Sequence, residues 1–201
     1  MSDDSTRARV IDAAVACILD EGFYRASSNK IARRAGVTWG VIQYHFGTRE
    51  ALLLAVHERG LDELDRCLAD AVIAGTSVEA RLGSFVDALW GYYRRPEFLA
   101  YMQVMLNLSH DPTTAESTQA ALKSVGARVN ERVPALTRAV VGTDVPDREI
   151  ERIGRFLYNV VRGLALDQEL LEAMPIAHSS ATEYDEQRAE LVRALALAIE
   201  P

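Results

Sequence analysis

The sequence predicts an all-α protein of two domains, and three observations lead to that prediction. Apolar residues recur three and four positions apart through most of the 201-residue chain, which is the spacing of one face of a helix. No stretch alternates apolar and polar residues in the way of a half-buried strand. The six prolines fall mainly near the boundaries of the periodic segments. The segments group into an N-terminal three-helix domain, residues 1–48, and a helical domain, residues 49–201, with about nine helices in all.

The first two helices are predicted from their apolar faces and end signals. The first covers residues 5–20 and stops at Gly22, and the second begins at Ser27 or Ser28 and ends at Gly36. A serine hydroxyl can cap a helix start, and glycine accepts the left-handed conformation common just after a helix end. The residues expected to be buried are Val10, Ile11, Ala14, Cys17 and Ile18 in the first helix, and Ile31, Ala32 and Ala35 in the second.

A third short helix follows the second after a tight turn. Thr38 is predicted to cap it, and the helix covers residues 39–46. Its spacing buries Val41, Ile42 and Phe46 and leaves Trp39, Gly40, Gln43 and Tyr44 on the outside. Two short helices about a glycine-containing turn of three to four residues form a helix-turn-helix, the motif that places its second helix in the DNA major groove. Such pairs also occur in proteins that never bind DNA, so the motif needs support from another observation.

Further helices are predicted to fill the chain after residue 48. Their ranges are 48–73, 77–92, 96–108, a segment from residue 114 with a kink or break at Pro134, 146–174 and 183–199. The helix that Thr48 caps would be on the order of 39 Å long at ~1.5 Å per residue. It would begin in the N-terminal domain and end in the next one, and so would link the two mechanically.

The distribution of charge supports the helix-turn-helix. The whole chain carries a formal charge of −7, yet no acidic residue lies between Glu21 and Glu50. The basic residues of that interval are Arg25, Lys30, Arg33, Arg34 and Arg49. A chain this acidic should avoid phosphate unless one surface is locally reversed. Because the reversed segment coincides with the helix-turn-helix, double-stranded DNA is the predicted partner.

The N-terminal segment also resembles a known family. The resemblance covers residues 7–56, of which residues 9–53 read RVIDAAVACILDEGFYRASSNKIARRAGVTWGVIQYHFGTREALL. With its Gly-Phe after the first helix, its Ala-Gly-Val turn and its Tyr-His-Phe triplet, this segment is similar to the DNA-binding domain of the tetracycline-repressor (TetR) family of bacterial transcription regulators. The resemblance implies a cytoplasmic homodimer that binds a palindromic operator, most commonly as a repressor, and is released by a small apolar or amphipathic molecule. Gln43 replaces a family tyrosine that often touches phosphate, which shifts that role to Tyr44 and His45.

The residues expected to contact DNA are Ser28, Lys30, Thr38, Trp39, Gly40, Gln43, Tyr44, His45 and Arg49. An amide side chain such as Gln43 favours a two-point contact with adenine, whereas hydroxyls, cations and helix-start amides hold phosphates. Two alternatives stay open. His45 can instead be a buried histidine, and Trp39 can pack on the first helix.

A ligand site is predicted where aromatic, thioether and polar groups occur among apolar ones. Its candidates are Trp90, Tyr93, Tyr101, Met105, Asn107, Phe156, Asn159 and Arg162. Small-molecule sites are usually apolar with a few polar groups, and a polar group in a helical core needs a partner that a ligand can supply. The alternative for each residue is ordinary core. Arg162 suits an acidic ligand, or else a pair with Asp167 or Glu169.

Helices near 146–173 and 183–199 are predicted to form the interface of a homodimer. Their apolar stripes are Ile150, Ile153, Leu157, Val161 and Leu164, and Leu191, Leu195 and Ala198. Two such helices from each subunit would make a four-helix interface. Packing within one subunit is the alternative.

No catalytic site is predicted. His57, His110 and His178 lack the spacing of metal ligands, and neither a phosphate-binding glycine loop nor a nucleophile motif occurs. We therefore expect no enzyme activity, no cofactor, no metal, and reduced thiols at Cys17 and Cys67. The absence of a long apolar run predicts no membrane span. The alternative function is a helical protein that binds a small molecule or a partner but no operator.

Overall fold

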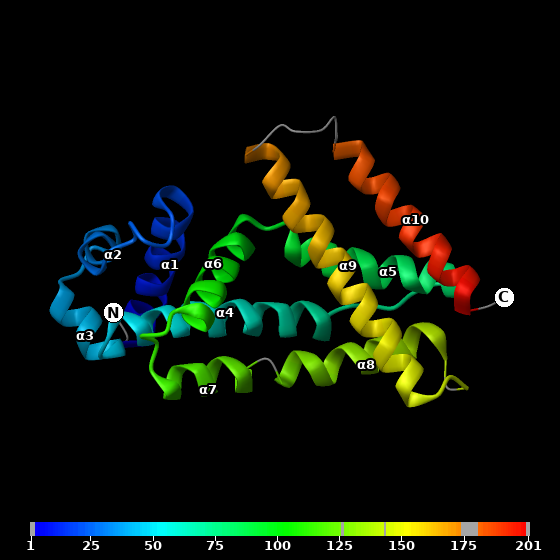
Figure 1. Cartoon of the computed structure of the whole chain (residues 1–201), viewed down its shortest axis with the longest axis horizontal. Helices are drawn as coiled ribbons and strands as arrows, with labels where there is room; N and C mark the ends of the chain where they lie inside the picture. Colours follow the sequence, from blue (N-terminus) through cyan, green and yellow to red (C-terminus); the bar gives the residue numbers. More distant parts are fainter. Residues whose placement is uncertain (1–2, 126, 143, 174–180, 200–201) are drawn as a thin grey trace. The chain divides into compact units, whose positions relative to one another are not determined.

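The computed structural model describes residues 3–125, 127–142, 144–173 and 181–199, and throughout these residues the only regular structure is α-helix (Figure 1). The predicted all-α class is confirmed, with ten helices in the described residues. They are α1 (Asp3–Glu21), α2 (Ser28–Ala35), α3 (Trp39–Phe46), α4 (Arg49–Ala69), α5 (Val78–Tyr93), α6 (Pro96–His110), α7 (Glu116–Val125), α8 (Ala127–Val141), α9 (Asp147–Ala173) and α10 (Ala181–Ile199). None of these described helices is long and apolar enough to cross a membrane.

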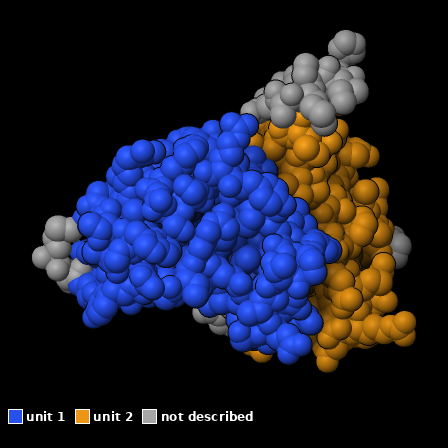
Figure 2. All heavy atoms as spheres, turned by 60° about the vertical axis from the view of Figure 1, so that its left-hand side comes forward, with its two compact units in different colours: residues 1–63, 95–127 blue, residues 64–94, 128–201 orange. Residues whose placement is uncertain are grey.

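The chain divides into two compact units, coloured separately in Figure 2. Unit 1 comprises residues 1–63 and 95–127, and unit 2 comprises residues 64–94 and 128–201. Helix α4 is continuous across the division after residue 63. The expected boundary between the two domains, at residues 48–49, lies inside unit 1. The division into a DNA-binding domain and a ligand-binding and dimerisation domain stays a prediction.

The core of unit 1 is built around α1. Val10, Ile11, Ala14, Cys17 and Ile18 are all buried, as the helical spacing predicts. They pack with buried residues of other helices, which include Ile31, Ala32, Ala35, Ile42, Leu52, Leu53, Ala100 and Val104. Each fully buried valine, leucine or isoleucine side chain contributes roughly 1.5–3 kcal/mol to the free energy of unfolding. This shared core holds α2 and α3 although each of them spans only eight residues.

Helix α2 ends at Gly36 in the manner that its sequence indicates. Gly36 has φ 65°, the left-handed conformation. Its N–H donates to the carbonyl of Arg33 at 3.2 Å, and the N–H of Val37 donates to the carbonyl of Ala32 at 3.0 Å. This pair of bonds closes the last turn and redirects the chain toward α3.

Helix α4 ends at Ala69 rather than at Ile73, so the predicted end is wrong by one turn. The chain after Ala69 passes close to α5. The Ala74 N–H donates to Ser84 Oγ at 3.1 Å, and a Cβ on Gly75 would lie 2.4 Å from the Cβ of Ala80. The segment must leave the helix to make this approach, and Val72, which would continue the apolar stripe, is 78% exposed.

A kink or a break was predicted at Pro134; the break is wrong, because Pro134 lies inside α8, and the kink stays a prediction. The packing of α8 against α9 explains why the helix continues. Val133 and Thr137 are buried, and a Cβ on Gly154 of α9 would lie 2.5 Å from Thr137 Oγ1 and 3.0 Å from Val133 Cγ1. This close contact stabilises a helical turn that proline alone disfavours.

In unit 2, α5 packs against both α9 and α10. The stripe of α9 that was expected to face a second subunit faces this core instead. Ile150, Ile153, Leu157 and Val161 are buried within the unit, and Leu164 is half-buried. The alternative of packing within one subunit therefore holds for this face of α9. The predicted loop 176–182 falls mostly outside the described residues.

Candidate functional site

The exposed face of α3 is the first element of the candidate site. Ile42 is fully buried and anchors the helix, while Gln43 and Tyr44 on the neighbouring positions are exposed. Tyr44 is 79% exposed, an unusual position for so large an aromatic side chain. The spacing argument is confirmed for Ile42, Gly40, Gln43 and Tyr44, whereas Val41 and Phe46, expected to be buried, and Trp39, expected outside, are each half-buried.

The first turns of α2 and α3 are not capped by side chains, whereas that of α4 is. Thr38 precedes α3 in an extended conformation, and its carbonyl accepts from the Val41 N–H at 3.1 Å, but its hydroxyl makes no cap hydrogen bond. Ser27 likewise makes no side-chain cap of α2. The predicted side-chain caps at these two positions are wrong. Thr48 does cap α4, because its Oγ1 accepts from the Ala51 N–H at 3.0 Å.

Trp39 and His45 lie closer to the protein than the outer face of α3. Trp39 is half-buried and packs against the core of unit 1. The His45 side chain is only 7% exposed, with Nε2 3.6 Å from Asp3 Oδ1 and the ring against Tyr44 and Phe46. The geometry therefore favours the packing alternative for both residues.

The basic residues of the segment are not equally available. Lys30 forms an ion pair with Glu21, and Arg34 pairs with Asp20 at 2.5 Å, so the end of α1 offsets part of the positive charge. Arg25 and Arg33 are exposed and form no ion pair among the described residues. An anion that approached these two guanidinium groups would therefore not have to displace an ion pair of the described residues.

Arg49 lies at the start of α4 and turns inward. Its Nη2 donates to the carbonyl of Phe23 at 3.1 Å and to the carbonyl of Ala26 at 3.4 Å. The guanidinium also lies over the Phe23 ring, 5.1 Å from its centre. Burial lowers the pKa of Arg49 from its usual value. Its contact with phosphate stays a prediction, and sequence reasoning missed these internal bonds because they join residues more than twenty positions apart.

The predicted ligand-site residues of α6 are used inside unit 1. The ring of Tyr101 lies against Gly60, where a Cβ would come within 2.5 Å of it, and its hydroxyl donates to Glu63 Oε2 at 3.1 Å. Burial raises the pKa of Tyr101 well above its usual range. Asn107 donates to the carbonyl of Gln103 in its own helix at 2.7 Å, and Met105 is half-buried.

The predicted ligand-site residues of unit 2 fall into separate groups. Tyr93, Asn159 and Arg162 gather around Tyr158: the two tyrosine rings are 5.8 Å apart, Arg162 lies 5.2 Å from the Tyr158 ring centre, and its Nη2 donates to Asn159 Oδ1 at 3.1 Å. Arg162 is thus held by Asn159 and Tyr158 rather than by the acidic partners considered for it.

Trp90 is covered by α10. Its ring stacks on Tyr184 at 6.4 Å, and the Arg188 guanidinium lies 4.5 Å above it. Trp90 therefore belongs to the packing of α5 and α10. Phe156, in contrast, is 49% exposed and lines a surface cleft of about 330 Å³ with Leu195, Ala198 and Ile199 of α10.

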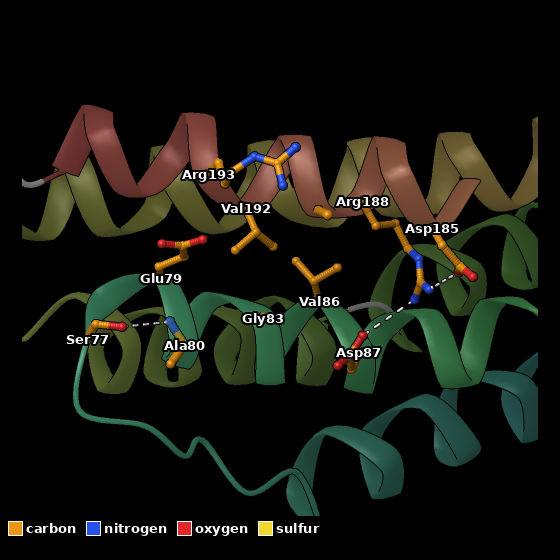
Figure 3. Close-up of a pocket in the computed structure, with 11 residues that line it drawn as sticks. Ser77, Glu79, Ala80, Gly83, Val86, Asp87, Asp185, Arg188, Val192 and Arg193 are labelled. Atoms are coloured by element: carbon orange, nitrogen blue, oxygen red, sulfur yellow. Dashed lines mark hydrogen bonds and ion pairs between the residues drawn. The ribbon is translucent and has the colours of Figure 1, made fainter. Parts of the chain in front are cut away.

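A second cleft of unit 2, about 440 Å³ in volume, lies between α5 and α10 and was not predicted. Figure 3 shows Val86 and Val192 pointing toward each other across it, with Arg188 at one end bonded to Asp87 at 3.4 Å and to Asp185. Gly83 adds room, because a Cβ there would meet nothing within 4 Å. Periodicity missed the cleft since each helix alone has the pattern of ordinary core.

Comparison with known proteins identifies the N-terminal segment. Residues 10–56 match the model of the bacterial regulatory proteins of the tetR family. Over 89 residues the chain is 33% identical to the HTH-type transcriptional activator FasR of Mycolicibacterium smegmatis, which covers 44% of this chain and 41% of FasR. The chain thus spans about two fifths of the length of this curated relative.

Solved structures match the chain over nearly its full length. A putative transcriptional regulator from Pseudomonas aeruginosa PAO1 aligns with a TM-score of 0.73 and 20% identity over 100% of this chain and 92% of that one. The multidrug binding protein EbrR, complexed with imidazole, aligns with a TM-score of 0.61 and 25% identity over 94% and 93% of the two chains. At 20% identity, the match to the Pseudomonas aeruginosa regulator establishes only that the two chains share a fold.

Proposed function

We propose that this chain, which belongs to the tetR family of bacterial regulatory proteins, binds operator DNA through α2 and α3 and regulates transcription. The observation that carries the proposal is the outward face of α3. It presents Gln43 and Tyr44 to solvent while Ile42 holds the helix on the core, and it lies in the acid-free stretch of an otherwise acidic chain. A short helix with such a face is suited to the major groove.

The contacts divide by chemistry. Gln43 makes the two-point contact with adenine. The small residues Thr38 and Gly40 let the start of α3 come close to the sugar–phosphate backbone or to a thymine methyl group. Tyr44, Arg25, Arg33 and the first amides of α4 hold phosphates, which set position rather than sequence. Lys30 joins them once it exchanges Glu21 for a phosphate. Arg25 and Arg33 are additions to the sequence-based set, because they are exposed and without an ion pair among the described residues.

The protein acts as a homodimer through α9 and α10. The faces offered for this contact are apolar and exposed: Phe156 of α9, Leu197 of α10 at 73% exposure, and the cleft between them. An interface of this kind repeats the same surface on both subunits and matches a palindromic operator, whose half-sites are about 34–36 Å apart.

A small apolar or amphipathic effector binds unit 2 and releases the operator. EbrR, a structural relative, is a multidrug binding protein complexed with imidazole, which supports a small-molecule site in this fold. Two places in unit 2 suit such a ligand, the cleft between α5 and α10 and the surroundings of Tyr93, Asn159 and Arg162. Helix α4 provides a mechanical route, because it starts beside α3 and continues past residue 63. A coupling of ~1–3 kcal/mol is enough to change operator occupancy at least fivefold.

Titration of the full chain with the DNA flanking its own gene tests the proposal. Fluorescence anisotropy at several salt concentrations should give a linear log–log dependence with a slope near −0.9 for each phosphate neutralised. A competing random duplex of equal length measures the specific part of the affinity. Binding that ignores salt, or that is equal for both duplexes, contradicts operator recognition.

The competing function is a helical small-molecule-binding protein without an operator. One observation favours it: Lys30, Arg34 and Arg49 already have partners inside the protein, which leaves a weaker positive surface than the sequence suggests. Absence of any DNA binding in dilute buffer, together with a folded dimer, supports this alternative.

A further inference from the structure

The turn between α1 and α2 is held from two sides by side chains of distant helices. The N–H of Phe23 donates to Gln103 Oε1 of α6 at 3.2 Å. The carbonyls of Phe23 and Ala26 accept from Arg49 Nη2 of α4 at 3.1 and 3.4 Å. All of these residues belong to unit 1. The peptide groups on both sides of Phe23 are therefore bonded to side chains that lie outside the turn.

The local bonds of this turn hold its shape but not its position. Gly22 adopts φ 81°, and the Ala26 N–H donates to the Gly22 carbonyl at 3.1 Å. These bonds join neighbours in the chain, so they move with the turn. The bonds to Arg49 and Gln103 are the ones that tie it to α4 and α6, and buried Phe23 and Ala26 limit its freedom further.

The Arg49 guanidinium contacts the turn at Phe23 and Ala26 rather than extending into solvent. Its guanidinium is half-buried, it lies over the Phe23 ring at 5.1 Å, and burial lowers its pKa. A planar guanidinium stacks on an aromatic face while its edge donates hydrogen bonds, which an ammonium group cannot do. A phosphate would have to compete with both Phe23 contacts.

We call the hydrogen bonds from Arg49 and Gln103 to this turn the clamp. Helix α2 begins at Ser28, directly after the turn, and only three residues join its last residue to α3. The position of the turn thus sets where α2 starts, and α2 together with its short connection sets where α3 lies. On this basis we propose that Arg49 and Gln103 are positioning residues that hold the recognition helix in register with the bases without touching DNA. The proposal rests on the proposed DNA-binding function.

The clamp affects the kinds of DNA contact differently. Base contacts need α3 within hydrogen-bonding distance of particular atoms, whereas phosphate contacts are longer-ranged and tolerate displacement. Loss of a clamp bond should therefore reduce the affinity for a specific duplex and leave that for random DNA, and the salt slope, unchanged. A phosphate contact behaves in the opposite way, since its loss weakens binding to all sequences and lowers the slope.

The experiment compares Arg49→Lys, Arg49→Gln, Gln103→Leu and the wild type, with Arg66→Lys, at an exposed arginine of the same helix α4, as a matched control. The probe is a duplex that the wild-type full chain selects from a random pool, with a scrambled duplex beside it. Lysine keeps the charge of Arg49, but its nitrogen ends one bond short and cannot stack on Phe23.

We expect Arg49→Lys and Gln103→Leu each to reduce the ratio of specific to random affinity by about three- to tenfold, as one lost hydrogen bond does. Their salt slopes should equal the wild-type slope, and Arg66→Lys should behave as the wild type. If Arg49→Lys keeps the wild-type ratio while Arg49→Gln reduces the slope by about 0.9, Arg49 holds a phosphate and the proposal is overturned.

A measurement without DNA separates failure of the clamp from failure of the proposed function. Amide hydrogen exchange should rise by about threefold or more in residues 22–35 of Arg49→Lys and Gln103→Leu, and stay unchanged in α9, because a lost clamp bond favours local opening. Unchanged exchange in residues 22–35 overturns the clamp even if the protein binds DNA. Raised exchange in a chain that selects no duplex supports the clamp and rejects the DNA function.

Discussion

The α2–α3 segment and α9 both carry apolar residues at helical spacing, but only in α2–α3 does the pattern lead to the correct partner. Ile31 and Ile42 are fully buried in the unit 1 core, which also contains α1. The turns at Gly36 and Gly47, both with positive φ, set the directions in which the chain leaves α2 and α3. In α9, Leu157 is equally buried, yet it faces its own unit and not the second subunit expected for it.

This difference comes from the density of end signals. In α2–α3 two glycines with positive φ lie within twelve residues, so the direction of each helix relative to the one before it is set locally. Helix α9 runs for 27 residues without such a signal. Its stripe indicates that one face is buried, and nothing in the helix indicates which surface covers that face.

The largest expected effect comes from placing a charge in the buried apolar stripe of α9. Leu157→Glu places an unpaired carboxylate in the core of unit 2 and should reduce the free energy of unfolding by about 4 kcal/mol or more. The matched control is Phe156→Glu, because Phe156 is half-exposed on the same turn and lines the cleft proposed for dimerisation.

Urea unfolding and sedimentation distinguish the two variants. Phe156→Glu should stay folded and shift from dimer to monomer, whereas Leu157→Glu should unfold at much lower urea. Two variants of equal stability would show that the stripe is not internal.

The next effect concerns the anchor of α3. Ile42→Ala should reduce the free energy of unfolding by ~2–5 kcal/mol, because it leaves a cavity under the recognition helix. Val41→Ala is the control, since Val41 is only half-buried and should cost clearly less. Chemical denaturation followed by circular dichroism measures both. Equal losses would mean that α3 is not held mainly by Ile42.

Two glycines of α9 sharpen the contrast between its faces. Gly154→Ala should destabilise the protein by ~1–3 kcal/mol, because the new methyl lies 2.5 Å from Thr137 Oγ1. Gly163→Ala meets nothing within 4 Å and should stabilise the helix by ~0.5–1 kcal/mol. Thermal unfolding of the pair gives the sign directly. The same sign for both would contradict the close packing of α8 on α9.

The smallest effect is on base recognition. Gln43→Ala should cost ~1–3 kcal/mol at one base-pair position in each half-site and leave the stability of the protein unchanged. Tyr44→Phe is the comparison, since it removes a hydroxyl proposed for phosphate and should weaken all sequences alike. Binding to a set of single-base operator variants measures both. A uniform loss for Gln43→Ala would remove it from base recognition.

The candidate site was predictable where it depends on neighbours in the chain. The exposed positions of Gln43 and Tyr44 and the Thr48 cap follow from spacing and residue type within one or two helical turns. Arg49 was not predictable in the same way. Its side chain has the chemistry of a phosphate ligand, but it donates to the carbonyls of Phe23 and Ala26. These two residues precede α2 in the chain, and only the folded structure brings them next to Arg49.

The ligand-site candidates illustrate the same limit. Trp90, Tyr93, Tyr101 and Phe156 were grouped because each is aromatic within an apolar pattern. In the structure, Tyr101 belongs to unit 1 and the others to unit 2, where Trp90 is stacked under Arg188 while Phe156 is half-exposed. Residue type indicated that these positions pack, and it carried no information about what they pack against.

The sequence by itself determined the helical class, the turn at Gly36, the buried face of α2, the positions of Ile42, Gln43 and Tyr44 on α3, and the similarity of the N-terminal segment to the tetR family. These features depend on backbone conformations and on periodicity along one helix, which residues a few positions apart decide. Only the tertiary structure decided where α4 ends, that α8 passes through Pro134, which surface covers α9 and what Arg49 binds. Each of these depends on contacts between segments far apart in the chain, and periodicity describes a helix relative to its own axis rather than to the surface opposite it.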